Sequence, residues 1–185
     1  MKVEVRSERS GDADEVARVH ELAFGSPDLA RLVRTIRASV GYRADRSLVA
    51  VTDERVVGHV LLNPVGLKDE AGIVRTTTVI APLGVLPPWQ RQGVGSALMQ
   101  EAIARLEQAE EPIAILRGDL GYYRRFGFVP AVRHGIRAPF SIEENVYLAK
   151  PLTRYRPEYA GMVRYPQPFA AVGYPVEWAY PDAEA

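Results

Sequence analysis

The chain has 185 residues, of which 47% are hydrophobic and 25% are charged, as in one ordinary globular domain or one domain with an extension. Its 23 Lys and Arg balance 23 Asp and Glu, so no overall basic excess indicates a nucleic-acid partner or an acidic membrane surface. Cysteine is absent, which excludes disulfides, a thiol nucleophile and a cysteine-based zinc site.

The N-terminal segment, residues 1–16, is charged and lacks the apolar core of a signal peptide. No run approaches the roughly 18 uncharged apolar residues that a membrane span needs. A chain without cysteine needs no oxidising compartment. We therefore expect a cytoplasmic protein that does not enter a membrane.

The first quarter of the chain predicts one strand and two helices. Residues 2–6 alternate apolar and polar side chains, which is typical of a short strand. Asp12 and Glu15 are spaced as in a helix capping box, and an apolar helical face follows at Val16, Val19, His20 and Ala23. Ser26-Pro27 favours the start of a second helix, because proline fits the first turn, and the apolar face of that helix comprises Leu29, Leu32, Val33 and Ile36.

Three extended runs come next and predict strands at residues 47–52, 56–63 and 76–85. Residues 53–55 are the expected hairpin loop between the first two of these strands. Leu67–Gly72 is expected to turn the chain before the third strand, so the first half of the sheet is mostly antiparallel.

The second half of the chain predicts two helices and two strands in alternation. A helix is expected over residues 93–109, where apolar residues recur along one face, and Pro112 stops it. A short buried strand over residues 113–116 follows, then a helical stretch that begins near Asp119. Residues 146–148 are the last expected core strand.

These elements predict a mixed α/β domain over residues 1–150, with a mostly antiparallel sheet flanked by helices. Residues 151–181 contain six prolines and five tyrosines but no helical period or repeat. Such a segment is too aromatic for a free linker. Residues 151–185 are therefore expected to form an irregular extension that packs on the core.

The segment Gln90–Ser96 stands between an expected strand and an expected helix and contains Gly93 and Gly95. Amide groups at a helix start have no helical partner and carry the positive end of the helix dipole. Glycines let a bulky anion approach the backbone without a clash with Cβ. The segment therefore predicts a pyrophosphate site, where Arg91 either adds positive charge or points into solvent.

Other interpretations of this segment are available. A P-loop requires a lysine that is missing here. A dinucleotide-binding fold requires a third glycine where Leu98 stands, and its first glycine follows the strand almost at once, although Asp119 could serve as its acidic ribose contact. A glycine-containing helix start without any ligand is the third alternative.

The residues around this segment resemble motif A of the GNAT superfamily of N-acetyltransferases, whose pattern is Q/R-x-x-G-x-G/A. Gln90, Gly93 and Gly95 occupy its fixed positions. The resemblance implies the GNAT (acyl-CoA N-acyltransferase) fold, with acetyl-CoA as the acetyl donor. It also implies that the pantetheine arm contacts the backbone of Leu83, Gly84 and Val85, and that the pyrophosphate is held by the backbone of Arg91, Gln92, Gly93, Val94, Gly95 and Ser96.

A second match lies downstream, where Tyr122–Phe128 resembles the Y-x-x-x-G-F element of the same family. The resemblance implies that Tyr123 is the general acid. A thiol has a pKa of about 8.5 and a tyrosine a pKa of about 10, so Tyr123 can donate a proton as the thiolate forms. The alternatives are that Tyr123 only packs on the core, or that a one-residue shift gives its role to Tyr122.

A narrower resemblance points to the YhbS-type branch of predicted N-acetyltransferases and includes Tyr165-Pro166 in the extension. The other matching segments are Ser47–Ala50, Val57–His59, Pro82-Leu83, Gly118-Asp119 and Tyr122–Phe128. This match is less specific than motif A, because several of its positions are ordinary core residues.

The residue that removes the proton from the acceptor is not evident in the sequence. Many GNAT enzymes place a glutamate on the strand before motif A, but residues 76–85 contain no carboxylate. Glu21, Glu143 and Glu177 are candidates, each with a solvated surface charge as the alternative. Deprotonation through water is a further alternative.

The three histidines carry no metal-site spacing. His20 lies on the apolar face of the first helix and His59 lies in a strand, so both are expected to be satisfied core or interface groups. His134 is expected in a loop near the acceptor cleft.

We therefore expect an acyltransferase that transfers the acetyl group of acetyl-CoA directly to a primary amine of a small molecule or peptide. Direct transfer follows because no cysteine is available for a covalent acetyl intermediate, and no metal, nucleic acid or membrane is expected to take part. A non-catalytic acyl-CoA sensor, favoured by the missing carboxylate, and a dinucleotide-binding domain are the alternatives. The aromatic extension either closes the cleft of one protomer or docks on a second protomer in a homodimer.

Overall fold

The computed structural model of the chain describes residues 3–180, so residue 2 of the first expected strand and residues 181–185 of the extension lie outside the described part. The chain forms two compact units. The first consists of the described part of Met1–Asn63 together with Ile80–Ala104. The second consists of Pro64–Val79 and the described part of Arg105–Ala185. Two strands and one helix contribute residues to both units.

The sheet of the first unit contains β1 (Glu4–Ser7), β2 (Ser47–Thr52) and the first part of β3 (Arg55–Lys68). Strand β2 pairs antiparallel with both neighbours, which confirms the expected β2–β3 hairpin. The hairpin turns at Asp53 and Glu54, whose φ angles of 48° and 61° belong to the left-handed region that tight hairpin turns require.

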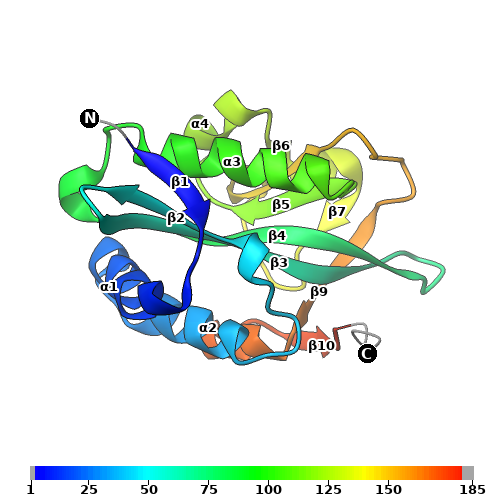
Figure 1. Cartoon of the computed structure of the whole chain (residues 1–185). Helices are drawn as coiled ribbons and strands as arrows, with labels where there is room; N and C mark the ends of the chain where they lie inside the picture. Colours follow the sequence, from blue (N-terminus) through cyan, green and yellow to red (C-terminus); the bar gives the residue numbers. More distant parts are fainter. Residues whose placement is uncertain (1–2, 181–185) are drawn as a thin grey trace. The chain divides into compact units, whose positions relative to one another are not determined.

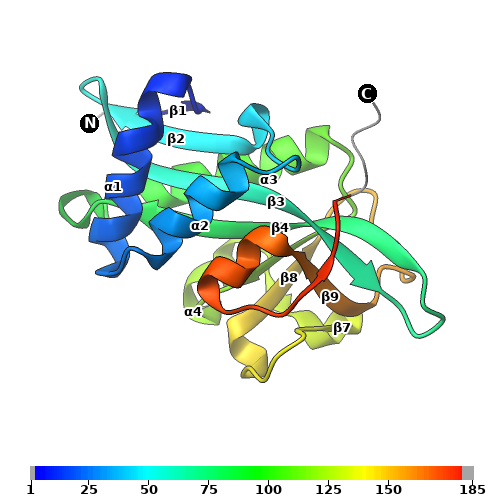
Figure 2. The same cartoon turned by 90° about the horizontal axis from the view of Figure 1, so that it is seen from below.

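Helices cover both faces of this sheet. Helices α1 (Ala13–Phe24) and α2 (Asp28–Arg37) lie on one face, and the first part of α3 (Val94–Gln108) lies on the other (Figures 1 and 2). The apolar stripes predicted from the sequence face the core, where the fully buried side chains include Val16, Val19, Leu32, Val33 and Ile36.

The predicted capping box at Asp12 and Glu15 is wrong. Asp12 has a helical backbone and makes no side-chain cap to α1. Its carboxylate instead accepts hydrogen bonds from the Arg6 guanidinium at 2.6 and 2.9 Å and from the backbone N–H of Arg9 at 2.7 Å. The side chain is thus occupied by a bidentate ion pair to Arg6 of β1, an interaction stronger than a neutral cap.

Two glycines let the helices of the first unit approach the strands closely. A Cβ at Gly58 of β3 would lie 2.9 Å from Leu98 Cδ1 and 3.1 Å from Val94 Cγ1 of α3. A Cβ at Gly84 of β4 (Val74–Val85) would lie 2.8 Å from Nδ1 of His20 on α1. The shortest distance at each position, 2.9 Å at Gly58 and 2.8 Å at Gly84, is below that of real Cβ contacts, so a larger residue at either position would force its neighbour to shift.

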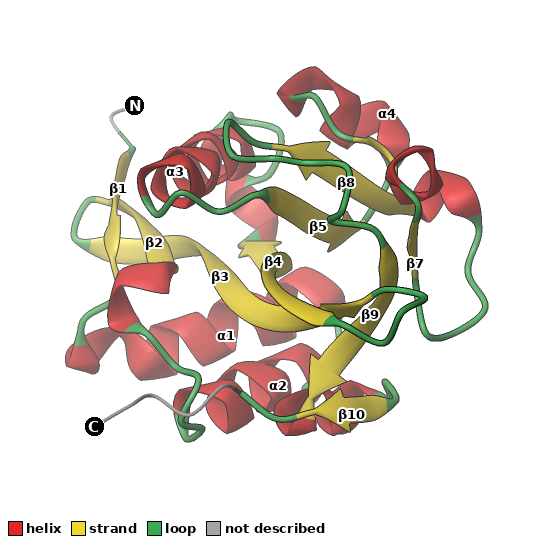
Figure 3. Cartoon of the chain, turned by 90° about the vertical axis from the view of Figure 1, so that its right-hand side faces the viewer, coloured by secondary structure: helices red, strands yellow, loops and turns green. Residues whose placement is uncertain are grey.

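The strands of the second unit pair in both parallel and antiparallel directions (Figure 3). The first part of β4 pairs parallel with β5 (Ile113–Arg117), which pairs antiparallel with β8 (Tyr147–Pro151). Strand β8 also pairs antiparallel with the short β6 (Val129–Pro130). The helical stretch expected near Asp119 is present as α4 (Leu120–Tyr123).

Regular structure also occurs after residue 150, where no period was evident in the sequence. Strand β9 (Gly161–Pro166) pairs antiparallel with the end of β3 and parallel with β7 (Ile136–Arg137) and β10 (Val176–Trp178). This pairing extends β3 to Lys68, so the turn expected at Leu67–Gly72 begins later. The division of the chain at residue 150 stays a prediction.

Aromatic side chains anchor the extension within the second unit. Tyr165 and Phe169 are each 1% exposed, and the Tyr165 hydroxyl lies 3.0 Å from the hydroxyl of Tyr147 on β8. The rings of Phe140 and Tyr174 pack against the same group. Burial of several aromatic rings supplies a large apolar area, which compensates for the entropy of ordering this segment.

Candidate functional site

The loop between β4 and α3 is held against the end of β4 by side-chain amides. Gln90 Nε2 donates to the carbonyl oxygen of Val85 at 3.0 Å, and Gln92 Nε2 donates to that of Pro88 at 2.6 Å. The short 3₁₀ turn Pro87–Trp89 lies between these anchors. The first unit therefore brings the two predicted donor-binding segments, 83–85 and 90–96, next to each other.

Left-handed backbone at two positions shapes the loop. Arg91 has a φ of 59° and Gly93 a φ of 88°, and a Cβ built on Gly93 would meet no atom of the chain within 4 Å. Glycine adopts such angles without the steric cost that a β-branched residue suffers. Open space thus adjoins the backbone of Gly93, as an approaching anion requires.

Helix α3 presents its first amides next to this space. The N–H of Ala97 donates to the carbonyl oxygen of Gly93 at 2.9 Å, which is the first bond of the helix ladder. The amides of Val94, Gly95 and Ser96 precede this bond and so have no i−4 carbonyl within the helix. A helix start of this kind, beside exposed residues 91–93, is suited to a phosphate group.

The other three predicted donor contacts lie at the end of β4. Leu83 is half-buried, whereas Gly84 and Val85 are buried. Gly84 packs directly on His20 of α1, so the face of this strand that the helix covers is closed by an imidazole.

Tyr123 lies in the second unit, at the end of α4. Asp119 caps this short helix by accepting a hydrogen bond from the N–H of Gly121 at 2.9 Å. The Tyr123 ring covers Gly118, where any Cβ would overlap it. Burial, with a smaller contribution from Tyr122, raises the pKa of Tyr123 to about 12, so its hydroxyl stays protonated near neutral pH.

The predicted base candidates are surface carboxylates. Glu21 is exposed and lies 3.9 Å from Arg34, and Glu177 pairs with Arg164. Glu143 is exposed as well. Nothing in these surroundings gives any of the three a desolvated position.

A buried polar chain in the first unit was not anticipated. His20 Nε2 lies 2.8 Å from His59 Nδ1, and His59 Nε2 lies 2.8 Å from Ser47 Oγ. Ser47 Oγ donates to Glu8, whose other carboxylate oxygen accepts from Arg37 at 2.5 Å. Both histidines are fully buried. The sequence offered one signal for this contact, since His20 lies on the apolar face of a helix and His59 lies in an apolar strand.

The environment sets the protonation of this chain. Burial lowers the pKa of His20 well below its usual value, and electrostatic interactions with the neighbouring His59 and with Arg37 lower it further. Burial also lowers the pKa of His59, although Glu8 opposes the shift. Burial would raise the pKa of Glu8, but hydrogen bonds from His59 and Ser47 and the charge of Arg37 outweigh it, so that pKa is lowered. Near neutral pH, this hydrogen-bonded set of side chains therefore contains an ionised Glu8 and two neutral imidazoles, those of His20 and His59.

The buried histidine pair predicts that the protein loses stability in mild acid. Unfolded histidines bind protons below about pH 6.5, whereas the buried pair resists protonation, so the unfolded state binds more protons there. The free energy of unfolding should fall by up to about 1.4 kcal/mol per pH unit for each histidine as the pH decreases below that value. The Glu8 contribution is lost only at lower pH, as the pH falls through its lowered pKa. Denaturant titrations between pH 5 and 8 measure this slope.

The matched comparison is a His20→Gln, His59→Gln double variant, which lacks both titrating groups. Its unfolding free energy should change less between pH 7 and pH 5 than that of the unsubstituted protein. Equal slopes in the two proteins would contradict the assignment of two neutral buried imidazoles.

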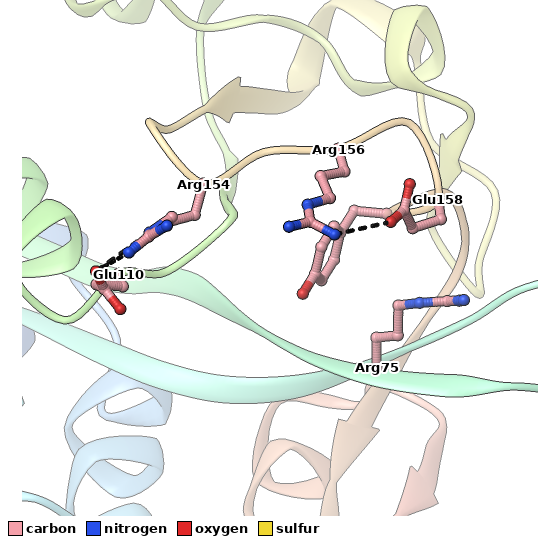
Figure 4. Close-up of a pocket in the computed structure, with 6 residues that line it drawn as sticks. Arg75, Glu110, Arg154, Arg156 and Glu158 are labelled. Carbon is pink, nitrogen blue, oxygen red and sulfur yellow. Dashed lines mark hydrogen bonds and ion pairs between the residues drawn. The ribbon is translucent and has the colours of Figure 1, made fainter.

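A pocket of about 360 Å³ in the second unit is unrelated to the predicted site residues (Figure 4). Its lining includes Arg75, Arg154, Arg156, Glu110 and Glu158. The arginines are paired, since Arg154 contacts Glu110, Arg156 lies 4.0 Å from Glu158, and Arg75 lies 2.6 Å from Asp69. Compensated charges of this kind give the pocket no strong preference for an anion.

Within residues 3–180, no group of three or more His, Asp and Glu side chains is arranged to hold a metal ion. No helix of that part of the chain has the length and apolarity needed to cross a lipid bilayer.

Two curated proteins of Escherichia coli strain K12 are similar in sequence. The uncharacterized N-acetyltransferase YjhQ is 33% identical over 135 residues, which cover 72% of this chain and 74% of YjhQ. The uncharacterized N-acetyltransferase YhbS is 29% identical over 144 residues, which cover 77% of this chain and 83% of YhbS.

Two solved structures share the fold over almost the whole chain. The GNAT family N-acetyltransferase YhbS from Escherichia coli, in complex with CoA, has a TM-score of 0.81 at 27% identity and covers 94% of this chain and 95% of its own. A GNAT family acetyltransferase from Brucella melitensis, in complex with acetyl-CoA, has a TM-score of 0.74 at 31% identity and covers 91% and 98%.

A family model agrees with these relatives. Residues 4–131, more than half of the chain, match the model described as the acetyltransferase (GNAT) domain. The GNAT fold predicted from motif A is thereby confirmed. The chain belongs to the GNAT acetyltransferase family.

Proposed function

We propose that this protein transfers the acetyl group of acetyl-CoA to a primary amine, and that the loop Gln90–Ser96 binds the pyrophosphate of the donor. The observation that carries the proposal is the geometry of this loop. It is tied to the end of β4 through Gln90, it leaves open space beside Gly93, and it leads directly into the amides of a long helix. The relatives from Escherichia coli and Brucella melitensis bind CoA and acetyl-CoA, which supports the same ligand here.

The pantetheine arm of the donor is proposed to contact the backbone of Leu83, Gly84 and Val85. A fixed backbone N–H on this strand, that of Leu83 or a neighbour, would donate to the oxyanion that forms when the amine attacks the thioester. A preorganised donor of this kind stabilises a transition state more than the ground state.

The proton for the departing sulfur is proposed to come from Tyr123. This role rests on the resemblance of Tyr122–Phe128 to the family element. The raised pKa keeps the Tyr123 hydroxyl protonated near neutral pH, but it also makes this phenol a weaker acid than a free tyrosine, so the resemblance alone carries the assignment. No covalent acetyl intermediate on cysteine can form, since the chain has no cysteine, so transfer is direct. We place the reaction in the cytoplasm, because a protein without cysteine needs no oxidising compartment.

A thiol-release assay with acetyl-CoA and a panel of primary amines tests this function. Small amines, peptide N-termini and lysine peptides form the panel, and free CoA should appear only when a suitable amine is present, with one acetylated amine per CoA. Binding of acetyl-CoA without turnover on any of these amines would instead favour an acyl-CoA sensor, for which the absence of a carboxylate on residues 76–85 is the supporting observation.

A further inference from the structure

The buried histidine pair ends in a nitrogen that has no partner within the described residues. Nδ1 of His20 is completely buried and makes no hydrogen bond. It lies against Gly84, where a Cβ would approach it to 2.8 Å. An unpaired buried polar atom costs free energy, so a reason for its presence is required.

The direction of each hydrogen bond in the chain can be assigned from its acceptor end. The ionised carboxylate of Glu8 only accepts, so the Ser47 hydroxyl donates its single proton to it. Ser47 Oγ must then accept from His59 Nε2–H, which leaves Nδ1 of the neutral His59 ring as an acceptor. His20 therefore donates through Nε2–H, and its Nδ1 holds a free lone pair.

The opposite arrangement is less favourable. If His59 were protonated, Nε2 of His20 would have to accept, and His20 would then present an Nδ1–H group with no acceptor inside the core. An orphaned buried N–H is rarer than an orphaned acceptor. The lowered pKa values of both rings agree with the neutral form.

We infer that His20 is the base that accepts the proton of the acceptor amine through one bridging water, and that His59, Ser47 and Glu8 orient it. The inference rests on the proposed function, which places the thioester on the backbone at Leu83–Val85. A neutral imidazole held in one tautomer by a carboxylate at the far end of a hydrogen-bond chain is a general arrangement for a base. Residues 76–85 contain no carboxylate that could accept a proton. His20 supplies a proton acceptor beside β4, the strand on which the acetyl donor is proposed to bind.

The surroundings of the base come from several elements. His59 stands on β3, and the ring of Phe24 on α1 stacks on His20 at a centroid distance of 6.1 Å. Phe24 is 48% exposed, so the ring that stacks on His20 reaches the surface, and the proposal requires a movement on this side that brings a water to Nδ1. The charged and titratable groups that act on the two histidines, directly or through the chain, are Glu8, Asp12, Arg37 and Tyr42.

The step balances as an acyl transfer. The amine nitrogen forms a bond to the acetyl carbonyl carbon, and the carbon–sulfur bond breaks. The ammonium proton passes through the water to Nδ1 of His20, while the thiolate receives a proton from Tyr123. The proton on His20 then returns through solvent to the tyrosinate, which leaves an amide, a free thiol and both side chains as they began.

His20→Gln separates this role from a structural one. A glutamine amide can still donate to His59 Nδ1 from the position of Nε2, but it offers no basic nitrogen near Gly84. We expect kcat to fall about a hundredfold or more, which is in the range for loss of a general base, while the affinity for acetyl-CoA changes little. The acid limb of the kcat–pH profile should also disappear. The matched control is Arg18→Gln, a substitution at an exposed position of the same helix α1, with kcat unchanged.

Glu8→Gln tests the orienting end of the chain. It keeps the size of the side chain but removes the negative charge, so the acid limb of kcat should move while the limb itself persists. The base assignment itself is decided by His20→Gln. If the kcat–pH profile of that variant keeps its acid limb, whether or not kcat is reduced, the assignment is overturned.

Nitrogen NMR of the imidazole side chains gives a readout that does not need turnover. Assigned with the His20→Gln and His59→Gln variants, His20 should show an unprotonated Nδ1 and a protonated Nε2, and CoA should shift the Nδ1 resonance. A protonated Nδ1, or no response to bound CoA, would overturn the inference even if no acceptor amine is found. Absence of acetyl-CoA binding to the unsubstituted protein would instead remove the proposed function itself.

Discussion

Gly93→Val is expected to weaken acetyl-CoA binding by at least about a hundredfold, about 2.8 kcal/mol. Gly93 has a φ of 88°, which a β-branched residue adopts only with strain, and its missing side chain leaves open the space assigned to the pyrophosphate. Valine would both distort the loop and fill that space. Calorimetric titration of acetyl-CoA into the variant measures the loss.

Gly173→Val is the matched control for strain alone. Gly173 also has a positive φ, of 76°, and its Cβ would likewise meet no neighbour within 4 Å, but it lies in the C-terminal extension. Both variants should lose a similar amount of folding stability in denaturant titrations, and only Gly93→Val should lose donor affinity. Equal affinities of the two variants for acetyl-CoA would contradict the assignment of this loop as the pyrophosphate site.

Tyr123→Phe is expected to lower kcat about a hundredfold while leaving the affinity for acetyl-CoA nearly unchanged. The substitution removes one hydroxyl and keeps the ring that packs over Gly118 and against Phe128. Steady-state assays with a saturating amine, together with donor titration, separate the two parameters. Because the pKa of Tyr123 is about 12, its ionisation should produce no alkaline limb in the kcat profile below about pH 11.

Tyr122→Phe is the control for this prediction, because it makes the same change on the neighbouring ring. The two rings are in edge-to-face contact, with centroids 4.9 Å apart. A loss of kcat in Tyr122→Phe with none in Tyr123→Phe would transfer the acid role by one residue. Unchanged kcat in both variants would exclude either tyrosine as the proton donor.

Local signals carried most of the fold. The hairpin of β2 and β3 was predicted because two apolar runs flank a short polar turn, and α2 begins where Ser26-Pro27 indicated, with Ser26 Oγ accepting from the N–H of Asp28 at 3.2 Å. The family predicted from motif A was confirmed by the family model, and of the two motif glycines Gly93 stands at a backbone position with φ above zero. The roles of Leu83–Val85, of residues 91–96 and of Tyr123 stay predictions.

Features that depend on distant partners were missed or misread. Asp12 has the spacing of a cap, but the nearby Arg6 takes its carboxylate. The length of β3 depends on pairing with β9, almost a hundred residues away in the sequence. The buried hydrogen bond between His20 and His59 joins residues 39 positions apart, and no spacing in the sequence predicts such a contact.

Calorimetric titration of the unsubstituted protein with acetyl-CoA, with NAD as the competing ligand class, tests the central claim most directly. We predict saturable binding of one acetyl-CoA per chain and no saturable heat with NAD. Saturable binding of NAD, or no binding of acetyl-CoA, would contradict the assignment of Gln90–Ser96 as the site for the donor.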